Sequence, residues 1–385
     1  MPKQKILFHT GSLAGGGAQR VIVTLLRELD RTRFEGYLVL REREGVYFDL
    51  VPPDIPIIAF PNGTLSRRKN ITQLGQIISE LQPHLVISFL DGANVLALET
   101  KLLKRPRCSF IISQRNNLSI SLQRNYPYSA WRRWLKRQQF RWLYRKADHI
   151  ISLSQGVKVD LVNKFKLPDR MITPIHNPID LELVEERSQA QVDYPWSRGE
   201  QYVILGVGRL IEQKGFSDLI NAFAKVRTSD TLSLPKGRPS KLLILGEGVL
   251  REQLESLVAS LNLQEHVYMP GFVDNPWAYM RDADLFVLSS HWEGLGNVVI
   301  EAMACGTPVI ATDCDFGPGE IIQHGENGIL VPVGDYERLG EAIGNLLNDS
   351  VERDRLAQAG RRRALDFESG KICRQYESIF DEYTG

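Results

Sequence analysis

Short, mostly apolar runs alternate with longer stretches of helical periodicity along the whole of this 385-residue chain. Runs of this kind are typical of strands buried on both faces of a parallel sheet, and the stretches between them are typical of covering helices. The sequence therefore predicts an α/β fold, with ligands bound beyond the carboxyl ends of the strands. The expected strands lie at residues 6–9, 37–40, 57–60, 85–90, 109–113, 149–154 and 171–175, and then at 202–207, 242–245, 267–269, 285–289, 308–311 and 329–331.

Two such series in one chain predict two domains, because 385 residues exceed what a single hydrophobic core usually organises. The charge distribution also divides the chain. Residues 1–180 carry 28 Lys/Arg against 14 Asp/Glu, whereas residues 181–385 carry 19 against 32. We expect a basic domain at 1–180 that suits an anionic surface or substrate and an acidic domain at 181–368. In the last segment, 369–385, Ile372, Tyr376, Ile379 and Phe380 lie at helical spacing, which predicts a helix that could pack anywhere, including back on the first domain.

The composition describes an ordinary folded protein, with 43% hydrophobic and 24% charged residues. The four cysteines, Cys108, Cys305, Cys314 and Cys373, lie far apart without a C-x-x-C pair, so neither a disulfide framework nor a zinc site is predicted. No apolar run has the length of a signal-peptide core or a membrane-spanning helix. These features favour a protein of the reducing cytoplasm that can still contact a membrane from one side.

A glycine-rich segment, GGGAQR at residues 15–20, follows the first expected strand and opens the first helix. Glycines at such a place let backbone amides approach an anion, and the helix N-terminus adds favourable partial charge. A plain tight turn between strand and helix is the alternative. The spacing fits neither a dinucleotide-binding fingerprint nor a P-loop.

Two cations follow a second glycine turn, GVGRLIEQKG at residues 206–215. Arg209 comes just after the expected strand, and Lys214 lies at the start of the next helix. Permanent cations beside a helix N-terminus suit a diphosphate and can neutralise a nucleotide leaving group without a metal. The alternative is that both are solvated surface residues. Ile211 stands where an NAD-binding fingerprint has its third glycine, which disfavours an NAD site.

Two glutamates frame a third segment, EGLGNVVIE at residues 293–301. Glu293 stands at the mouth of an expected helix, and Glu301 lies about two turns inside it. A carboxylate at the mouth can accept hydrogen bonds from sugar hydroxyls, and one further inside can accept two from a ribose diol. Alternatively, Glu293 only complements the helix dipole and Glu301 is solvated. Glu301 lies in an apolar run, however, where an unpaired carboxylate is unfavourable.

These segments together resemble the retaining glycosyltransferases of family 4, which have the GT-B fold of two Rossmann-like domains, over nearly the whole chain. The resemblance rests on GGGAQR at 15–20, VGRLIEQKG at 207–215, LGEGVLREQLE at 245–255, GFVDNP at 271–276 and EGLGNVVIEAMACGTPVIATDCDFGPGEI at 293–321. It implies a transferase whose second domain binds a nucleotide sugar. In this family, retention is drawn as attack on the face that the nucleotide leaves, with the donor phosphate taking the acceptor proton.

The same resemblance implies roles for single residues. The implied catalytic residues are Arg209, Lys214, Glu293 and Arg115. The implied donor-binding residues are Gly16, Gly208, Arg209, Lys214, Gly246, Phe272, Val273, Glu293, Gly294, Leu295, Gly296, Asn297 and Glu301. Within this set the two cations bind the diphosphate, Glu301 binds the ribose, and Glu293 with the amides at 294–297 binds the sugar. No metal or other cofactor is implied, and the D-x-D patterns at 282–284 and 313–315 are interpreted as coincidence.

The acceptor residues are predicted in the first domain. They are Arg67, Arg68, Lys69, Arg115 and Asn116. SRRKN, ISFLDGAN, SQRNN and GPGEI look most like the branch that adds N-acetylhexosamines to polyprenyl-diphosphate-linked intermediates or builds exopolysaccharide repeats. The chain departs from that branch at Gln114, where a glutamate usually precedes the arginine. A solvated helix start is the alternative for the three cations at 67–69.

A basic, aromatic segment at residues 124–146 combines eight cations with the aromatic residues Trp131, Trp134, Phe140, Trp142 and Tyr144. Such a helix fits an interfacial segment that rests on anionic lipid headgroups. Two alternatives remain: the aromatics are buried in the core with only the cations in water, or the segment binds nucleic acid. We expect membrane contact and no nucleic acid, because no nucleic-acid-binding module is recognised.

The sequence thus predicts a cytoplasmic transferase, peripheral on the inner face of the cell membrane. It would move a hexose or N-acetylhexosamine from a nucleotide sugar, with UDP as the expected nucleotide, to a lipid-linked or polysaccharide acceptor. A nucleotide-sugar 2-epimerase on the same fold is one alternative, and a non-catalytic nucleotide-sugar sensor is another. The intact Arg209, Lys214, Glu293 and Glu301 disfavour the sensor.

Overall fold

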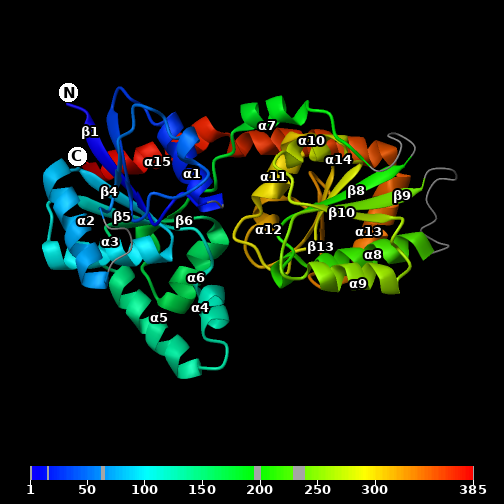
Figure 1. The fold of residues 1–385 in the computed structure, drawn as a ribbon, viewed down its shortest axis with the longest axis horizontal. Helices are drawn as coiled ribbons and strands as arrows, with labels where there is room; N and C mark the ends of the chain where they lie inside the picture. Colours follow the sequence, from blue (N-terminus) through cyan, green and yellow to red (C-terminus); the bar gives the residue numbers. More distant parts are fainter. Residues whose placement is uncertain (1, 15–16, 62–65, 195–200, 229–238, 385) are drawn as a thin grey trace. The chain divides into compact units, whose positions relative to one another are not determined.

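The computed structural model describes residues 2–14, 17–61, 66–194, 201–228 and 239–384. The chain divides into two compact units (Figure 1). The first comprises Met1–Pro178 together with Ser369–Gly385, and the second comprises Ile179–Glu368. The chain therefore passes between the units twice, and its last segment belongs to the unit in which it began.

A parallel sheet of seven strands, in the order β3-β2-β1-β4-β5-β6-β7, lies at the centre of the described part of the first unit. Its strands are β1 (Gln4–Thr10), β2 (Phe34–Leu40), β3 (Ile57–Ala59), β4 (Leu85–Phe89), β5 (Ser109–Gln114), β6 (His149–Ser152) and β7 (Ile172–Pro174). Its helices are α1 (Gly17–Glu28), α2 (Arg67–Leu81), α3 (Asp91–Lys104), α4 (Leu118–Asn125), α5 (Ala130–Tyr144), α6 (Gln155–Phe165) and α15 (Ser369–Thr384).

The described residues of the second unit form a six-stranded parallel sheet in the order β10-β9-β8-β11-β12-β13. Its strands are β8 (Tyr202–Val207), β9 (Ser240–Leu245), β10 (Val267–Gly271), β11 (Leu285–Leu288), β12 (Val309–Thr312) and β13 (Ile329–Val331). Its helices are α7 (Leu181–Ser188), α8 (Phe216–Thr228), α9 (Arg251–Ser260), α10 (Pro276–Asp282), α11 (Asn297–Ala304), α12 (Pro318–Ile321), α13 (Tyr336–Asn348) and α14 (Ser350–Ala364).

Each strand expected from the apolar runs is present, and the predicted α/β fold with two parallel sheets is confirmed. Strand β4 is buried at every position and so is β11, as expected for parallel strands that are covered on both faces. The strands of each sheet run in the same direction, so their carboxyl ends meet at one edge of that sheet. These two edges are where functional residues are expected.

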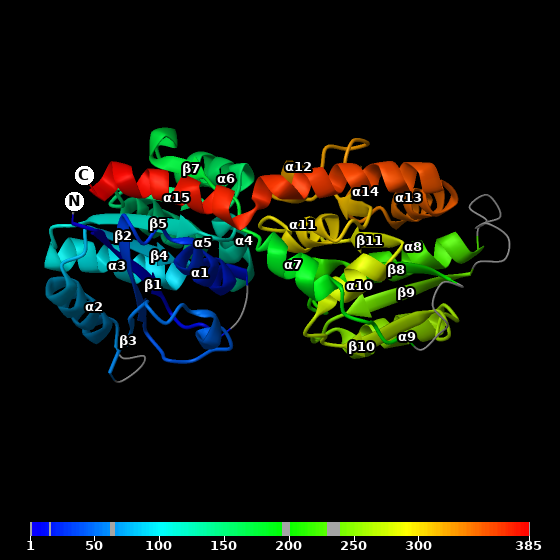
Figure 2. The same ribbon diagram turned by 90° about the horizontal axis from the view of Figure 1, so that it is seen from above.

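The C-terminal helix α15 belongs to the core of the first unit, among elements drawn in blue at the other end of the sequence (Figure 2). Ile372, Tyr376, Ile379 and Phe380, which share one helical face, are all buried in that core. The ring of Phe380 meets the ring of Phe8 edge-on, with centroids 6.1 Å apart. The helical spacing read from the sequence thus corresponds to a face that packs beside β1.

Candidate active site

The donor residues implied by the sequence follow the carboxyl ends of strands in the second unit. Residues 208–209 follow β8, Gly246 follows β9, residues 272–273 follow β10, and residues 293–296 lie between β11 and α11, which begins at Asn297. The structure therefore brings them to one edge of the six-stranded sheet. Ligands of open α/β sheets bind at this edge.

The loops after β8 and β9 approach each other closely through their backbones. Gly246 has φ +145°, and a Cβ atom on it would lie 1.9 Å from the carbonyl oxygen of Gly208. The amide of Gly208 donates to the carbonyl of Leu245 at 2.9 Å. Only glycine fits such a contact at position 246. The exposed side chain of Arg209 therefore extends from a closely packed backbone.

Lys214 and Glu293 form a buried ion pair in the second unit. Lys214 Nζ lies 2.6 Å from Glu293 Oε1, and the two side chains are 14% and 8% exposed. Ser290 Oγ donates to the same carboxylate oxygen at 2.7 Å. A buried carboxylate needs such partners, because removing an isolated charge from water is strongly unfavourable. The alternative of a solvated Lys214 is therefore wrong, and any ligand of Lys214 also meets Glu293.

Helix α11 begins beside Glu293. Gly296 caps the helix with φ +89°, a left-handed conformation that glycine adopts without strain. Leu295 is buried, whereas Gly294 and Asn297 are half-buried. The first amides of a helix have no acceptor within the helix, and they favour negative charge at its N-terminus. Amide donors and the carboxylate of Glu293 thus lie at the segment that links β11 to α11, and the ammonium of Lys214 contacts that carboxylate.

Glu301 is buried inside α11 and has a specific partner. The indole N–H of Trp277, a buried residue of α10, donates to Glu301 Oε2 at 3.1 Å. The alternative of a solvated Glu301 is therefore wrong. The indole fixes one carboxylate oxygen and so sets the orientation of the whole group. The sequence analysis did not assign a role to Trp277, although it directly follows the GFVDNP motif.

The end of β10 presents an exposed aromatic residue. Phe272 is exposed and Val273 is half-buried. Just before them, Gly271 has φ +99°, and a Cβ atom there would lie 2.8 Å from Glu247 Oε1. Arg251 holds that carboxylate, with Nη2 2.6 Å from the same oxygen. The backbone at the end of β10 is thus closely packed, and the ring of Phe272 that follows it is accessible to a planar ligand.

Arg115 is buried in the first unit, where it contacts the C-terminal helix. Its Nη1 donates to the hydroxyl of Tyr376 at 2.8 Å, and its Nη2 donates to Asn177 Oδ1. These contacts join α15 to the end of β5, so they describe a positioning role. Its implied catalytic role stays a prediction. Gly16, the donor-binding residue implied in this unit, lies outside the described residues.

The other predicted acceptor residues have different surroundings. Arg67, at the start of α2, forms an ion pair with Glu99 of α3, with its Nε 2.7 Å from Glu99 Oε2. Arg68 and Lys69 are exposed on the same helix. Asn116 donates to Asp91 Oδ2 at 3.3 Å. The structure therefore balances the charge of Arg67 within the protein and leaves its neighbours in solvent.

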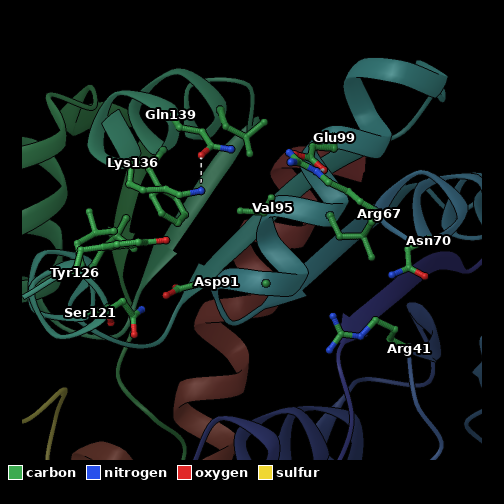
Figure 3. Close-up of a pocket in the computed structure, with 17 residues that line it drawn as sticks. Arg41, Arg67, Asn70, Asp91, Val95, Glu99, Ser121, Tyr126, Lys136 and Gln139 are labelled. Carbon is green, nitrogen blue, oxygen red and sulfur yellow. Dashed lines mark hydrogen bonds and ion pairs between the residues drawn. The ribbon is translucent and has the colours of Figure 1, made fainter. Parts of the chain in front are cut away.

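A cavity of about 520 Å³ lies at the carboxyl edge of the seven-stranded sheet (Figure 3). We call it the α3 cavity, because one face of α3 contributes to its wall. Its lining residues are Arg41, Arg67, Asn70, Asp91, Gly92, Val95, Leu96, Glu99, Leu118, Ser121, Leu122, Asn125, Tyr126, Lys136, Gln139, Phe140 and Leu143. Arg67 is a predicted acceptor residue, whereas Asp91 received no role from the sequence although it lies in the ISFLDGAN motif.

Helix α5 exposes three tryptophans. Trp131, Trp134 and Trp142 are 63%, 58% and 58% exposed, and their spacing places them on one side of the helix. Tyr144 of the same helix is buried. The alternative that hides the aromatics in the core is therefore wrong for the tryptophans. No helix within the described ranges has the length and apolar composition needed to cross a membrane.

Neither D-x-D pattern belongs to a group of metal ligands in the described part of the chain. Asp313 and Asp315 are exposed, and Asp284 Oδ2 accepts a hydrogen bond from the amide of Val203 at 2.9 Å. Within the described residues, no group of three or more His, Cys, Asp or Glu side chains is arranged to hold a metal ion. That the reaction needs no metal stays a prediction.

Two family models match the chain. The model described as Glycosyltransferase Family 4 matches residues 15–183, and the model described as Glycosyl transferases group 1 matches residues 193–363. A Campylobacter jejuni enzyme, N-acetylgalactosamine-N,N'-diacetylbacillosaminyl-diphospho-undecaprenol 4-alpha-N-acetylgalactosaminyltransferase, is 31% identical over 96% of this chain and 98% of its own. The chain belongs to glycosyltransferase family 4. The family 4 resemblance found in the motifs is thereby confirmed, and the protein is a glycosyltransferase.

Further comparisons agree with membership of family 4. The lipopolysaccharide core biosynthesis glycosyltransferase LpsE of Rhizobium meliloti is 34% identical over 98% of this chain and 96% of its own. The crystal structure of Anabaena Alr3699/HepE in complex with UDP has a TM-score of 0.79 at 22% identity, over 98% of this chain and 100% of that chain. The crystal structure of a Rickettsia africae glycosyltransferase has a TM-score of 0.77 at 18% identity, over 100% of this chain and 99% of that chain. The predicted GT-B fold of family 4 is confirmed.

Proposed function

We propose that this family 4 enzyme transfers a hexose or N-acetylhexosamine from a UDP-sugar, with retention of configuration and without a metal ion. The Lys214–Glu293 pair beside the N-terminus of α11 is the observation that carries the proposal. It places a half-buried cation, a buried carboxylate and helix amides at the edge of the sheet where ligands bind. Arg209 extends toward solvent from the same edge.

These groups suit the departure of a nucleoside diphosphate. When the bond between the anomeric carbon and the phosphate oxygen breaks, the leaving diphosphate gains negative charge. The ammonium of Lys214, the guanidinium of Arg209 and the first amides of α11 would stabilise that charge, and fixed donors of this kind act most strongly where water is excluded. Glu293 keeps lone pairs for sugar hydroxyls, while Lys214 and Ser290 hold it in place.

Retention follows from the order of bond changes in this proposal. The acceptor hydroxyl oxygen attacks the anomeric carbon on the face that the diphosphate leaves. A phosphate oxygen of the leaving group takes the hydroxyl proton, so no carboxylate of the protein needs to act as nucleophile. The products are the glycosylated acceptor and UDP, and atoms and charge balance without a further reagent.

The nucleotide would lie against the loops after β10 and β11. Glu301, oriented by Trp277, would accept hydrogen bonds from the ribose hydroxyls, and the backbone near Phe272 would meet the base. Support for UDP comes from similar structures, because those of Anabaena HepE are titled as complexes with UDP and with UDP-glucose. Support from this chain is the exposed ring of Phe272, which can stack on a base.

The acceptor is proposed to be lipid-linked or a growing polysaccharide at the inner face of the cell membrane. The Campylobacter relative is named for a saccharide on diphospho-undecaprenol, and the Rhizobium relative for the lipopolysaccharide core. The exposed tryptophans of α5 lie among cations, with Lys146 Nζ 5.6 Å from the ring of Trp142. Such a surface suits anionic headgroups.

The test combines nucleotide binding with product analysis. We expect UDP to raise the melting temperature more than GDP or ADP does, because bound ligand stabilises the folded state. A panel of UDP-sugars is then incubated with a membrane lipid extract in EDTA, and products are identified by mass spectrometry and by the anomeric NMR coupling of the new linkage. An α-linked product from an α-linked donor supports the proposal.

Other outcomes would contradict parts of it. Loss of turnover in EDTA that added Mg²⁺ restores would contradict metal independence. An inverted product would contradict the order of bond changes. Epimerised sugar nucleotide without transfer would indicate the 2-epimerase, and UDP binding without turnover on any lipid or saccharide would indicate the sensor.

A further inference from the structure

The carboxylate of Asp91 lines the α3 cavity and is held by two amides. Gln114 Nε2 donates to Asp91 Oδ1 at 2.8 Å, and Asn116 Nδ2 donates to Asp91 Oδ2 at 3.3 Å. The buried hydroxyl of Tyr144 donates to Gln114 Oε1 at 2.8 Å, which fixes the orientation of the Gln114 amide. Each carboxylate oxygen can accept more than one hydrogen bond. Asp91 can therefore accept a further hydrogen bond from a hydroxyl group inside the cavity.

The residue before Asp91 has an unfavourable backbone conformation. Leu90 has φ +75°, which is unfavourable for a residue with a branched side chain of this size. Strain of this kind tends to gather at functional positions, where the surrounding structure holds it. Burial raises the pKa of Asp91, and the hydrogen bonds from Gln114 and Asn116 oppose that rise. The two amides thus favour the ionised form of a carboxylate that burial would otherwise protonate.

Two cationic side chains that line the α3 cavity, Arg41 and Lys136, form no ion pair with another described residue. Arg41 Nε is buried and has no acceptor among the described residues. Lys136 Nζ donates to Gln139 Oε1 at 3.0 Å, which is a neutral partner. Figure 3 shows Lys136 and Arg41 on either side of α3. A buried donor normally has a partner, so Arg41 suits an anion that enters the cavity, and Lys136 adds a second positive charge to the lining.

The wall formed by α4 and α5 is apolar. Leu118, Leu122 and Phe140 line it, and these side chains suit the C–H face of a sugar ring. The volume of about 520 Å³ lies within the range of small-molecule sites. A free sugar would leave the two cations without a partner, and inorganic phosphate would leave Asp91 and the apolar wall without one. A sugar joined to a diphosphate satisfies all three groups.

We propose that the α3 cavity binds the sugar and diphosphate of a lipid-linked acceptor, with Asp91 accepting a hydrogen bond from a hydroxyl of that sugar and Arg41 and Lys136 contacting the diphosphate. This inference rests on the proposed function and names the site of its acceptor. It also gives the first unit a binding residue, Asp91, that the motifs did not indicate.

Gly92 offers a way to fill the cavity without disturbing the protein. It lines the cavity in the first turn of α3, and a Cβ atom on it would have no atom within 4 Å. The probe is farnesyl diphosphate carrying one N-acetylglucosamine, and its binding is measured by calorimetric titration. We expect Gly92→Phe to abolish measurable binding because the ring occupies the cavity. Gly92→Ala adds one methyl group and should bind as the wild type does.

Asp91→Asn tests the hydroxyl contact. A hydrogen bond to a charged group lost in this way should weaken probe binding by roughly 10- to 100-fold. The matched control is Asp148→Asn, because Asp148 precedes β6 at the opposite edge of the same sheet and pairs with Lys101 at 2.6 Å. That control should not change the affinity. Melting temperatures of all variants report whether the fold is intact.

The outcomes separate this inference from the proposed function. UDP should raise the melting temperature of the wild type and of every variant equally, since the donor edge belongs to the second unit. If the wild type does not bind the probe, or if Gly92→Phe and Asp91→Asn bind it as tightly as their controls, the α3 cavity is not the acceptor site. If UDP stabilises none of the proteins, the proposed function fails whatever the probe does.

Discussion

At the scale of single residues, the donor edge is defined by partners that are distant in sequence. Lys214 and Glu293 each occur in a recognisable motif, but their direct contact at 2.6 Å follows only from the fold. Trp277 is a clearer case, because nothing in its neighbourhood in the sequence indicates that its indole binds Glu301. The motifs thus predicted which residues gather at the edge, and the fold determined which of them hold one another.

Lys214→Ala should affect stability and activity together. The substitution leaves Glu293 buried without its cation, which costs about 3–5 kcal/mol of unfolding free energy. It also removes the cation that would stabilise the leaving diphosphate, so kcat/KM should fall by roughly 100-fold or more. The control is Lys225→Ala, whose ion pair with Glu337 lies at the surface and should contribute less than about 1 kcal/mol. Urea unfolding that shows equal losses in both variants would contradict the buried pair.

His9→Gln should change the pH dependence of stability. Burial lowers the pKa of His9 from 6.5 to about 4, opposed by its hydrogen bond to the carbonyl of Val39 and assisted by the charge of Arg41. Between pH 6.5 and about 4, His9 is therefore protonated in the unfolded chain but largely neutral in the folded protein. The free energy of unfolding should fall as the pH drops from 6.5 toward 4, by roughly 3 kcal/mol in total, and this contribution is constant above pH 6.5.

The measurement is urea unfolding of the wild type and His9→Gln between pH 4.5 and pH 8. Other titrating groups are present in both proteins, so the difference between the two curves isolates His9. We expect the free energy of unfolding of the wild type minus that of His9→Gln to be constant above pH 6.5 and to decrease below it. Parallel curves over the whole range would show that His9 does not resist protonation.

At the scale of elements, α5 combines two faces with different partners. Its inner side chains, such as Phe140 and Leu143, line the α3 cavity, and its tryptophans are exposed on the outside. The helix therefore joins the proposed acceptor site to the proposed membrane surface within one unit. An acceptor held by a lipid would meet both faces of the same element.

Replacing Trp131, Trp134 and Trp142 together with serine should abolish binding to anionic vesicles. The indoles are more than half exposed, so the fold should be little affected. Flotation with vesicles of phosphatidylglycerol and phosphatidylcholine measures the bound fraction, and binding by the wild type should weaken in high salt because surface charge is screened. Val249→Ser is the control, since Val249 is an exposed apolar residue of the second unit. Equal recovery of all three proteins would contradict a membrane role for α5.

The elements were largely predictable from the sequence, because strands buried in parallel sheets need continuous apolar runs. Even the three-residue strands β3 and β13 were indicated by such runs. The α3 cavity was not predictable, because it depends on Arg41, which follows β2, and on side chains from α2, α3, α4 and α5 that meet only in the fold. Asp91 lies in the ISFLDGAN motif, but the motif by itself does not indicate that its carboxylate lines a cavity. The orientation of the α5 tryptophans was likewise open, since helical spacing alone does not say which face is buried.

At the scale of the whole molecule, the two units differ in how the chain builds them: one is a continuous segment and the other has two segments. The second unit is a continuous segment, Ile179–Glu368, whereas the first needs both ends of the chain. The charge distribution suggested a division after Asp180, and the structure divides the chain at Pro178. The spacing of apolar residues predicted the helix at the C-terminus but left its place open, because amphipathicity does not specify a partner.

Removing residues 369–385 should unfold the first unit and spare the second. The deletion takes Ile372, Tyr376, Ile379 and Phe380 out of the core, and each buried apolar side chain contributes about 1.5–3 kcal/mol. That sum approaches the whole stability of a typical domain. Limited proteolysis should therefore degrade the first unit, while UDP should still stabilise the second against heat. A truncation after Tyr383 is the control and should behave as the intact chain.

The return of the chain to its starting unit has a consequence for protein synthesis. Domains usually fold in the order in which they emerge from the ribosome. Here a segment that fills the core of the first unit is translated after the whole of the second unit, so the first unit can close only after the second has been made. The half made second is the first that can fold, and the nascent N-terminal half is the one that would need a chaperone.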